Sequence, residues 1–179
     1  SIYYMAAFGF TLVAYRGPET GSREVVSYVM QQGKIRLVLT SALNKDHEIA
    51  KHVALHGDGV KVLALWVDDA RYSYESTVSR GAEPAFEPTV LKDEDGEVVI
   101  SSIKTYGETI HTFVERKNYR GVFLPGYKAW SSNRRIEPIG LEYIDHCVGN
   151  VELGSMNKWV DFYQEVMGFK LLITFDDND

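Results

Sequence analysis

The side chains in this sequence best suited to hold a metal ion are its histidines. His52 and His56 are four residues apart in a segment with helical periodicity, so both rings would lie on one face of a helix at a spacing that two ligands can have. No carboxylate or third histidine follows at a suitable position, so surface or capping roles explain this pair better. His146 stands in Asp145-His146-Cys147-Val148, inside a strand-like run. A strand would hold its ring in the protected, neutral state that metal ligation requires.

Other candidate groups have simpler explanations. Cys147 should point to the opposite face of the strand from His146, so we expect it to be buried packing rather than a nucleophile. His111 is most simply a structural residue of its strand. Four glycines invite comparison with phosphate loops but lack the strand–GxxxxGK–helix context, so turn geometry explains them better: Gly17, Gly21, Gly57 and Gly59.

Composition limits the classes of function. Apolar residues make up 45% of the 179 and charged residues 25%, which is the mix of an ordinary folded soluble protein. A formal net charge of −6 argues against nucleic acid as a partner, because phosphate binding requires a basic surface. No apolar run approaches the roughly 20 residues that cross a bilayer, so we expect no membrane contact. The single cysteine permits no internal disulfide and favours a reducing, cytoplasmic setting.

Hydrophobic periodicity predicts an α+β fold. Helices and strands alternate irregularly and include hairpins, which indicates a mixed sheet rather than a doubly wound parallel one. Gly9 should end the first helix, and residues 119–138 should form a connector. Helices are expected at 3–8, 46–56, 69–80 and 156–166, and strands at 10–15, 25–30, 35–39, 60–67, 87–92, 97–104, 109–115, 141–148 and 170–175.

A short internal repeat indicates two tandem modules. Tyr3-Tyr4-x-x-x-Phe8-Gly9-Phe10-x-Leu12 matches Phe162-Tyr163-x-x-x-Met167-Gly168-Phe169-x-Leu171 at a constant offset of 159. A strand is expected before the second copy, but nothing precedes the first. The chain also opens without Met, in what has the character of a helix. We therefore expect both ends to be cut, with the first strand missing and the second module truncated.

Two levels of resemblance follow from this pattern. Tandem strand–helix–strand–hairpin units resemble the vicinal oxygen chelate superfamily, whose βαβββ modules form a half-open mixed-sheet barrel around a metal. Within it, the chain resembles the 4-hydroxyphenylpyruvate dioxygenases over essentially its whole length and in the same order. The stretches that carry this resemblance are Leu12–Glu24, Gln32–Ala42, His56–Val60, Thr105–Thr112, Phe123–Tyr127 and Ile144–Gly154.

The resemblance implies a metal site. Members of this family bind a non-haem Fe(II) through two His and one Glu, which leaves positions open for an α-keto acid and O2. By this likeness His146 is the first ligand and Val148 helps to wall the substrate pocket. The other two ligands should lie beyond Asp179, so this fragment is not expected to hold the iron of the full-length protein. Val62 stands where the catalytic module would carry its second His, so the first module should be metal-free.

The resemblance also implies a reaction and a domain plan. The full-length enzyme would convert 4-hydroxyphenylpyruvate and O2 to homogentisate and CO2 in tyrosine breakdown, as a homo-oligomer. The fragment itself should be inactive and carries no assigned catalytic residue. We expect a metal-free domain at 1–118, a linker at 119–139 and the start of the iron-binding domain at 140–179. The alternatives are a hydroxymandelate synthase, or a non-catalytic binding module of the same superfamily.

One expectation concerns packing. Trp159, Phe162 and Tyr163 would be exposed in a second module whose sheet is incomplete. Residues 141–175 should therefore pack against the first module or a neighbouring chain, or else be poorly ordered.

Overall fold

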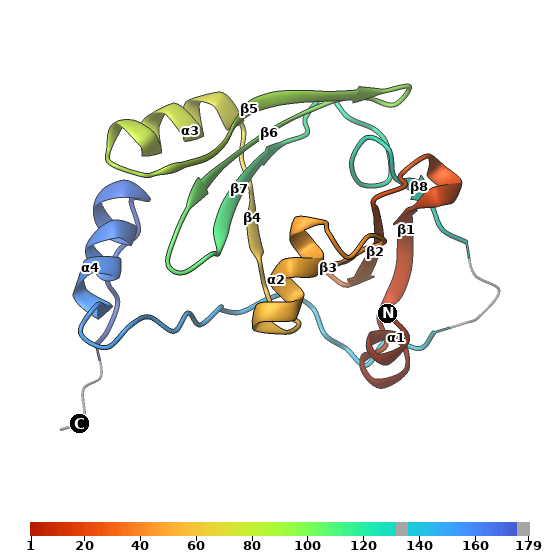
Figure 1. Ribbon diagram of the computed structural model, residues 1–179, viewed down its shortest axis with the longest axis horizontal. Coiled ribbons are helices and arrows are strands. Elements are labelled where there is room, and N and C mark those ends of the chain that lie inside the picture. The colour runs from red at the N-terminus through yellow and green to blue at the C-terminus, as the bar shows by residue number, and fades with distance from the viewer. Residues whose placement is uncertain (132–135, 175–179) are drawn as a thin grey trace. The chain divides into compact units, whose positions relative to one another are not determined.

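The computed structural model describes residues 1–131 and 136–174 (Figure 1). The chain divides into two compact units. Unit 1 consists of Ser1–Gly59, Lys92–Gly96 and Tyr119–Cys147, and unit 2 of Val60–Leu91, Glu97–Asn118 and the residues from Val148 onward. No helix in these two described ranges has both the length and the apolar character needed to cross a membrane.

Unit 1 is built on an antiparallel sheet with the strand order β3-β2-β1-β8. Its core consists of Phe10, Leu12, Met30 and Ile35, and Tyr4 and Met5 of α1 pack against it. The expected hairpin at 25–39 is confirmed. The elements are α1 (Ile2–Phe8), β1 (Thr11–Arg16), a 3₁₀ turn (Pro18–Thr20), β2 (Val25–Gln32), β3 (Ile35–Ala42), α2 (Glu48–His56) and β8 (Lys128–Ala129).

Unit 2 contains the mixed sheet, with the strand order β4-β7-β6-β5. β4 runs parallel to β7, and β6 runs antiparallel to β7. Asp69 begins α3, where its Oδ1 accepts from the backbone N of Tyr72 at 2.8 Å. The elements are β4 (Val62–Trp66), α3 (Ala70–Ser79), β5 (Pro84–Asp93), β6 (Gly96–Lys104), β7 (Ile110–Glu115), α4 (Met156–Asp161) and a π turn (Phe162–Val166) that continues α4.

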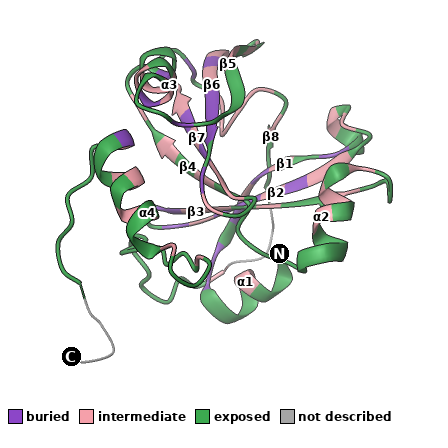
Figure 2. Ribbon diagram, turned by 60° about the vertical axis from the view of Figure 1, so that its left-hand side comes forward, coloured by how far each residue is buried: buried purple, intermediate pink, exposed green. Residues whose placement is uncertain are grey.

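Buried residues concentrate on the strands, while the helices are largely exposed on their outer sides (Figure 2). In unit 2 the core comprises Ala70, Ala82, Ile103, Phe113 and Val166, and Phe162 and Met167 pack against it. The helix at 156–166 therefore packs against β6 and β7, which is the first of the three outcomes expected for residues 141–175.

The internal repeat is confirmed as a repeated helix end. The backbone N of Phe10 donates to the carbonyl of Tyr4 at 3.2 Å, and the N of Phe169 donates to the carbonyl of Tyr163 at 2.8 Å. The same two aromatic pairs are in contact, with ring centroids 6.0 Å and 5.6 Å apart. Each helix ends at a glycine with positive φ. A sequence match at offset 159 thus encodes one capping structure twice.

The strands expected at 141–148 and 170–175 are wrong for the residues that the structure describes. Residues 141–148 and 170–174 are irregular, and residue 175 lies outside the described ranges. A sequence with strand propensity does not form a strand by itself, because its backbone N–H and C=O groups must form hydrogen bonds with a neighbouring strand. Between Leu141 and Val148 the strand-like pattern has no such neighbour in the described part of the chain.

Candidate functional site

The predicted ligand His146 lies on the irregular segment that leads toward α4. Its side chain is 74% exposed, and its Nδ1 lies 2.7 Å from Oδ2 of Asp145. The protected ring position expected from a strand is therefore not found, because that strand does not form. Cys147 is also exposed, which corrects the expectation of buried packing. Val148 is 81% exposed, and its assignment to a substrate pocket stays a prediction.

Asp145 nevertheless gives His146 a recognisable ligand arrangement. A carboxylate that accepts the N–H of one ring nitrogen fixes the tautomer and leaves the other nitrogen with a lone pair for a metal. The residues present thus fit the first ligand of an iron site. One imidazole does not fill a facial triad, so this segment alone is an incomplete donor set.

The two histidines of α2 lie side by side, as their spacing predicted. The ring centroids of His52 and His56 are 4.7 Å apart. The capping role belongs to another histidine, since His47 precedes the helix and its Nδ1 accepts from the backbone N of Ile49 at 3.1 Å. Val62 begins β4 opposite Ile110 of β7, and an aliphatic side chain offers no metal ligand there.

His111 forms the buried polar centre of unit 2. It is 3% exposed on β7, with Nδ1 3.2 Å from the carbonyl oxygen of Leu63 and Nε2 2.9 Å from the hydroxyl of Tyr163. A carbonyl can only accept, so Nδ1 carries the proton, and Nε2 accepts from Tyr163. Both ring nitrogens are satisfied by protein groups, in agreement with the structural role expected for His111.

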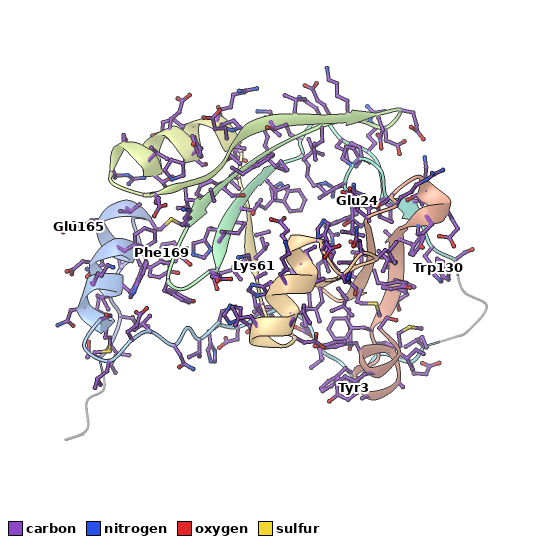
Figure 3. All side chains as sticks on the ribbon, viewed as in Figure 1. Tyr3, Glu24, Lys61, Trp130, Glu165 and Phe169 are labelled. Atoms are coloured by element: carbon purple, nitrogen blue, oxygen red, sulfur yellow. The ribbon has the colours of Figure 1, made fainter. Side chains whose placement is uncertain are left out.

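Burial keeps both partners of this pair neutral. Burial lowers the pKa of His111, and its bond to Leu63 opposes this only in part. Burial raises the pKa of Tyr163, and the neighbouring Tyr106 raises it further. Phe169, labelled in Figure 3, stacks on Tyr163 with ring centroids 5.6 Å apart. Sequence reasoning listed Tyr163 as an apolar packing residue and missed its hydroxyl, although the repeat marks the position.

Replacing Tyr163 by Phe should destabilise the chain by about 1–3 kcal/mol, because Nε2 of a buried imidazole would lose its donor. Urea unfolding measures the change. Tyr143→Phe is the matched control, since the Tyr143 side chain is 61% exposed, and it should have little effect. Equal stability of the two variants would show that the Tyr163–His111 bond contributes nothing.

The stability of the chain should fall as the pH falls below about 6.5. His111 has a lowered pKa when folded, whereas the unfolded chain keeps the ordinary value of 6.5. Between these values the unfolded state binds a proton that the folded state does not, so the free energy of unfolding decreases toward acid. Urea unfolding at several pH values between 5 and 8 should show a smaller slope in His111→Gln, which retains every other titrating group. Identical slopes would contradict the assignment.

The chain is similar to a known protein family and to several named proteins. Residues 3–124 match the family model described as hydroxyphenylpyruvate dioxygenase, N-terminal. Proteins named 4-hydroxyphenylpyruvate dioxygenase from Coccidioides posadasii and Dictyostelium discoideum are 40% and 42% identical over 99% and 98% of this chain. The chain covers 49% of each, so it spans about half the length of the curated relatives it matches.

Solved structures confirm the fold class. A mutant 4-hydroxymandelate synthase from Streptomyces coelicolor matches with a TM-score of 0.75 and 28% identity, over 93% of this chain and 47% of that one. A methylmalonyl-CoA epimerase from the same organism matches at 0.52 and 17% identity, over 65% of this chain and 86% of the epimerase, which shows the fold alone. These neighbours have the vicinal oxygen chelate fold expected from the sequence. On this evidence the chain belongs to the 4-hydroxyphenylpyruvate dioxygenase family.

Proposed function

We propose that this chain is the N-terminal part of an Fe(II)-dependent dioxygenase that converts 4-hydroxyphenylpyruvate and O2 to homogentisate and CO2. One observation carries the proposal. Three curated relatives that are 38–40% identical over 98–99% of the chain all bear the name 4-hydroxyphenylpyruvate dioxygenase. The chain covers 47–49% of these relatives, so the activity belongs to the longer protein and the chain alone should be inactive.

Within that enzyme we assign His146 as the first metal ligand. The contact between its Nδ1 and Asp145 supports this assignment, because it leaves Nε2 to donate its lone pair. When bound, Fe(II) would supply coordination positions for the α-keto acid and for O2. Val148 would contribute an apolar wall near the substrate ring. The other two ligands would come from residues that this chain does not contain.

The domain plan follows from the same proposal. Residues 1–118 would form a metal-free domain, 119–139 a linker and 140–179 the start of the iron-binding domain. Val62 supports the metal-free assignment, since it offers no ligand atom where the resemblance places a histidine. Self-association stays a prediction of the family resemblance, and a cytoplasmic setting stays a prediction from the single cysteine.

Hydroxymandelate synthase is the second candidate, and one observation favours it. The solved structure that matches over 93% of the chain is a 4-hydroxymandelate synthase, at 28% identity. The curated dioxygenases are more similar, at 38–42% identity. Greater similarity to the dioxygenases makes homogentisate the expected product.

The product decides between these two functions. The complete protein should be incubated with Fe(II), O2 and 4-hydroxyphenylpyruvate, and the products separated by chromatography. Homogentisate and CO2 in equal amounts are expected, whereas hydroxymandelate would establish the second candidate. Binding of the keto acid without turnover would instead indicate a non-catalytic module. The 179-residue chain is the control, and it should yield no product.

Removal of the proposed ligand tests the site. His146→Ala in the complete protein should reduce bound iron from about one per chain to a small fraction, because two ligands hold Fe(II) much less tightly than three. Iron content after gel filtration measures the loss. His56→Ala is the matched control, since it removes an imidazole from α2, and it should retain iron. Full iron content in His146→Ala would exclude this residue as a ligand.

A further inference from the structure

The side chain of Gln32 connects residues 137–142, here called the strap, to the β2–β3 hairpin through hydrogen bonds. It is the last residue of β2 and is 6% exposed. Its Oε1 accepts from the backbone N of Ile139 and of Leu141, each at 3.0 Å. Its Nε2 donates to the carbonyl oxygen of Phe8 at the end of α1. One buried amide therefore joins three segments of unit 1 through three hydrogen bonds.

The strap also lies unusually close to the backbone of unit 1. A Cβ at Gly9 would come within 2.6 Å of the carbonyl oxygen of Glu137, and one at Gly33 within 2.7 Å of that of Glu142. Both glycines have positive φ, so a side chain would be strained as well as obstructed. The backbone N of Lys34 donates to the Glu142 carbonyl at 2.6 Å. Both ends of the strap thus meet glycines that allow close approach.

We propose that Gln32 is a positioning residue for the metal-ligand segment. Glu142 and His146 are four residues apart, and an extended chain spans at most about 3.6 Å per residue, so a fixed Glu142 keeps the Cα of His146 within about 14 Å. By holding the strap, Gln32 limits the volume in which the His146 ring lies. The positioning of a ligand, as distinct from a segment, rests on the proposed function.

The contacts of Gln32 contribute position more than overall stability. Ile139 is 59% exposed and Leu141 37%, so the strap runs along the surface, where water can replace hydrogen bonds after Gln32 is removed and the strap moves. The hairpin itself is held by eight register pairs between β2 and β3. Loss of the amide should therefore release the strap while the fold persists.

Hydrogen exchange on the 179-residue chain tests the strap. In Gln32→Leu, amide exchange in residues 139–150 should accelerate about tenfold. Gln31→Leu is the matched control, because among the described residues the Gln31 side chain makes long bonds to Gly33 and Arg36, at 3.4 Å and 3.5 Å, and none to the strap. Ile139→Pro removes one donor from the strap side and should act in the same direction. If Gln32→Leu fails to fold, exchange in Ile139→Pro still tests the proposal.

Iron affinity of the complete protein tests the consequence for the ligand. Gln32→Leu should weaken Fe(II) binding about tenfold, the size of effect found for residues that orient ligands, while Gln31→Leu should not. Unchanged exchange in both Gln32→Leu and Ile139→Pro would overturn the proposal, and so would faster exchange with wild-type iron affinity. Failure of the proposed function is visible separately, as wild-type iron content in His146→Ala.

Discussion

Buried polar side chains must form hydrogen bonds, and two of them fix the position of the chain after residue 138. In unit 2 the imidazole of His111 is completed by the hydroxyl of Tyr163. In unit 1 the amide oxygen of Gln32 is completed by the N–H groups of Ile139 and Leu141. An unpaired group at either site would cost about 1–3 kcal/mol. A buried side chain on each sheet therefore determines where a later segment lies, although residues 141–148 add no strand to either sheet.

Sequence patterns predicted the elements that are stabilised by their own neighbours. The apolar runs at 25–30 and 35–39 predicted the hairpin of β2 and β3, which pair over eight register positions. The strands expected at 87–92 and 97–104 are joined through residues 93–96, where the backbone N of Asp95 donates to Oδ1 of Asp93 at 2.9 Å. The helix end at Gly9 and its repeat at Gly168 were equally local, since each bond spans six residues. Local signals suffice where the stabilising partners are near in sequence.

The features that sequence reasoning missed depend on distant partners. Gln32 ends β2 directly before the turn at Gly33 and Lys34, where an exposed polar side chain is the ordinary expectation. Its partners lie 107 and 109 residues later. The hydroxyl of Tyr163 finds His111 across 52 residues, on a helix face that the pattern marked only as apolar. The strand expected at 141–148 failed for the same reason, because the period-2 pattern describes a strand but does not supply its neighbour.

The position of His146 follows from chain connectivity more than from contacts of its own ring. Asp145 is 77% exposed and His146 74%, so water competes for both groups and their pairing restrains the ring weakly. A metal ligand needs a fixed direction, and a site built on a mobile support loses affinity. On the N-terminal side of His146, within the described residues, the strap is a firm anchor, because the buried amide of Gln32 holds it. Under the proposed function, residues that bind no metal would thus still act on the metal site, since they fix the chain that leads to the proposed ligand His146.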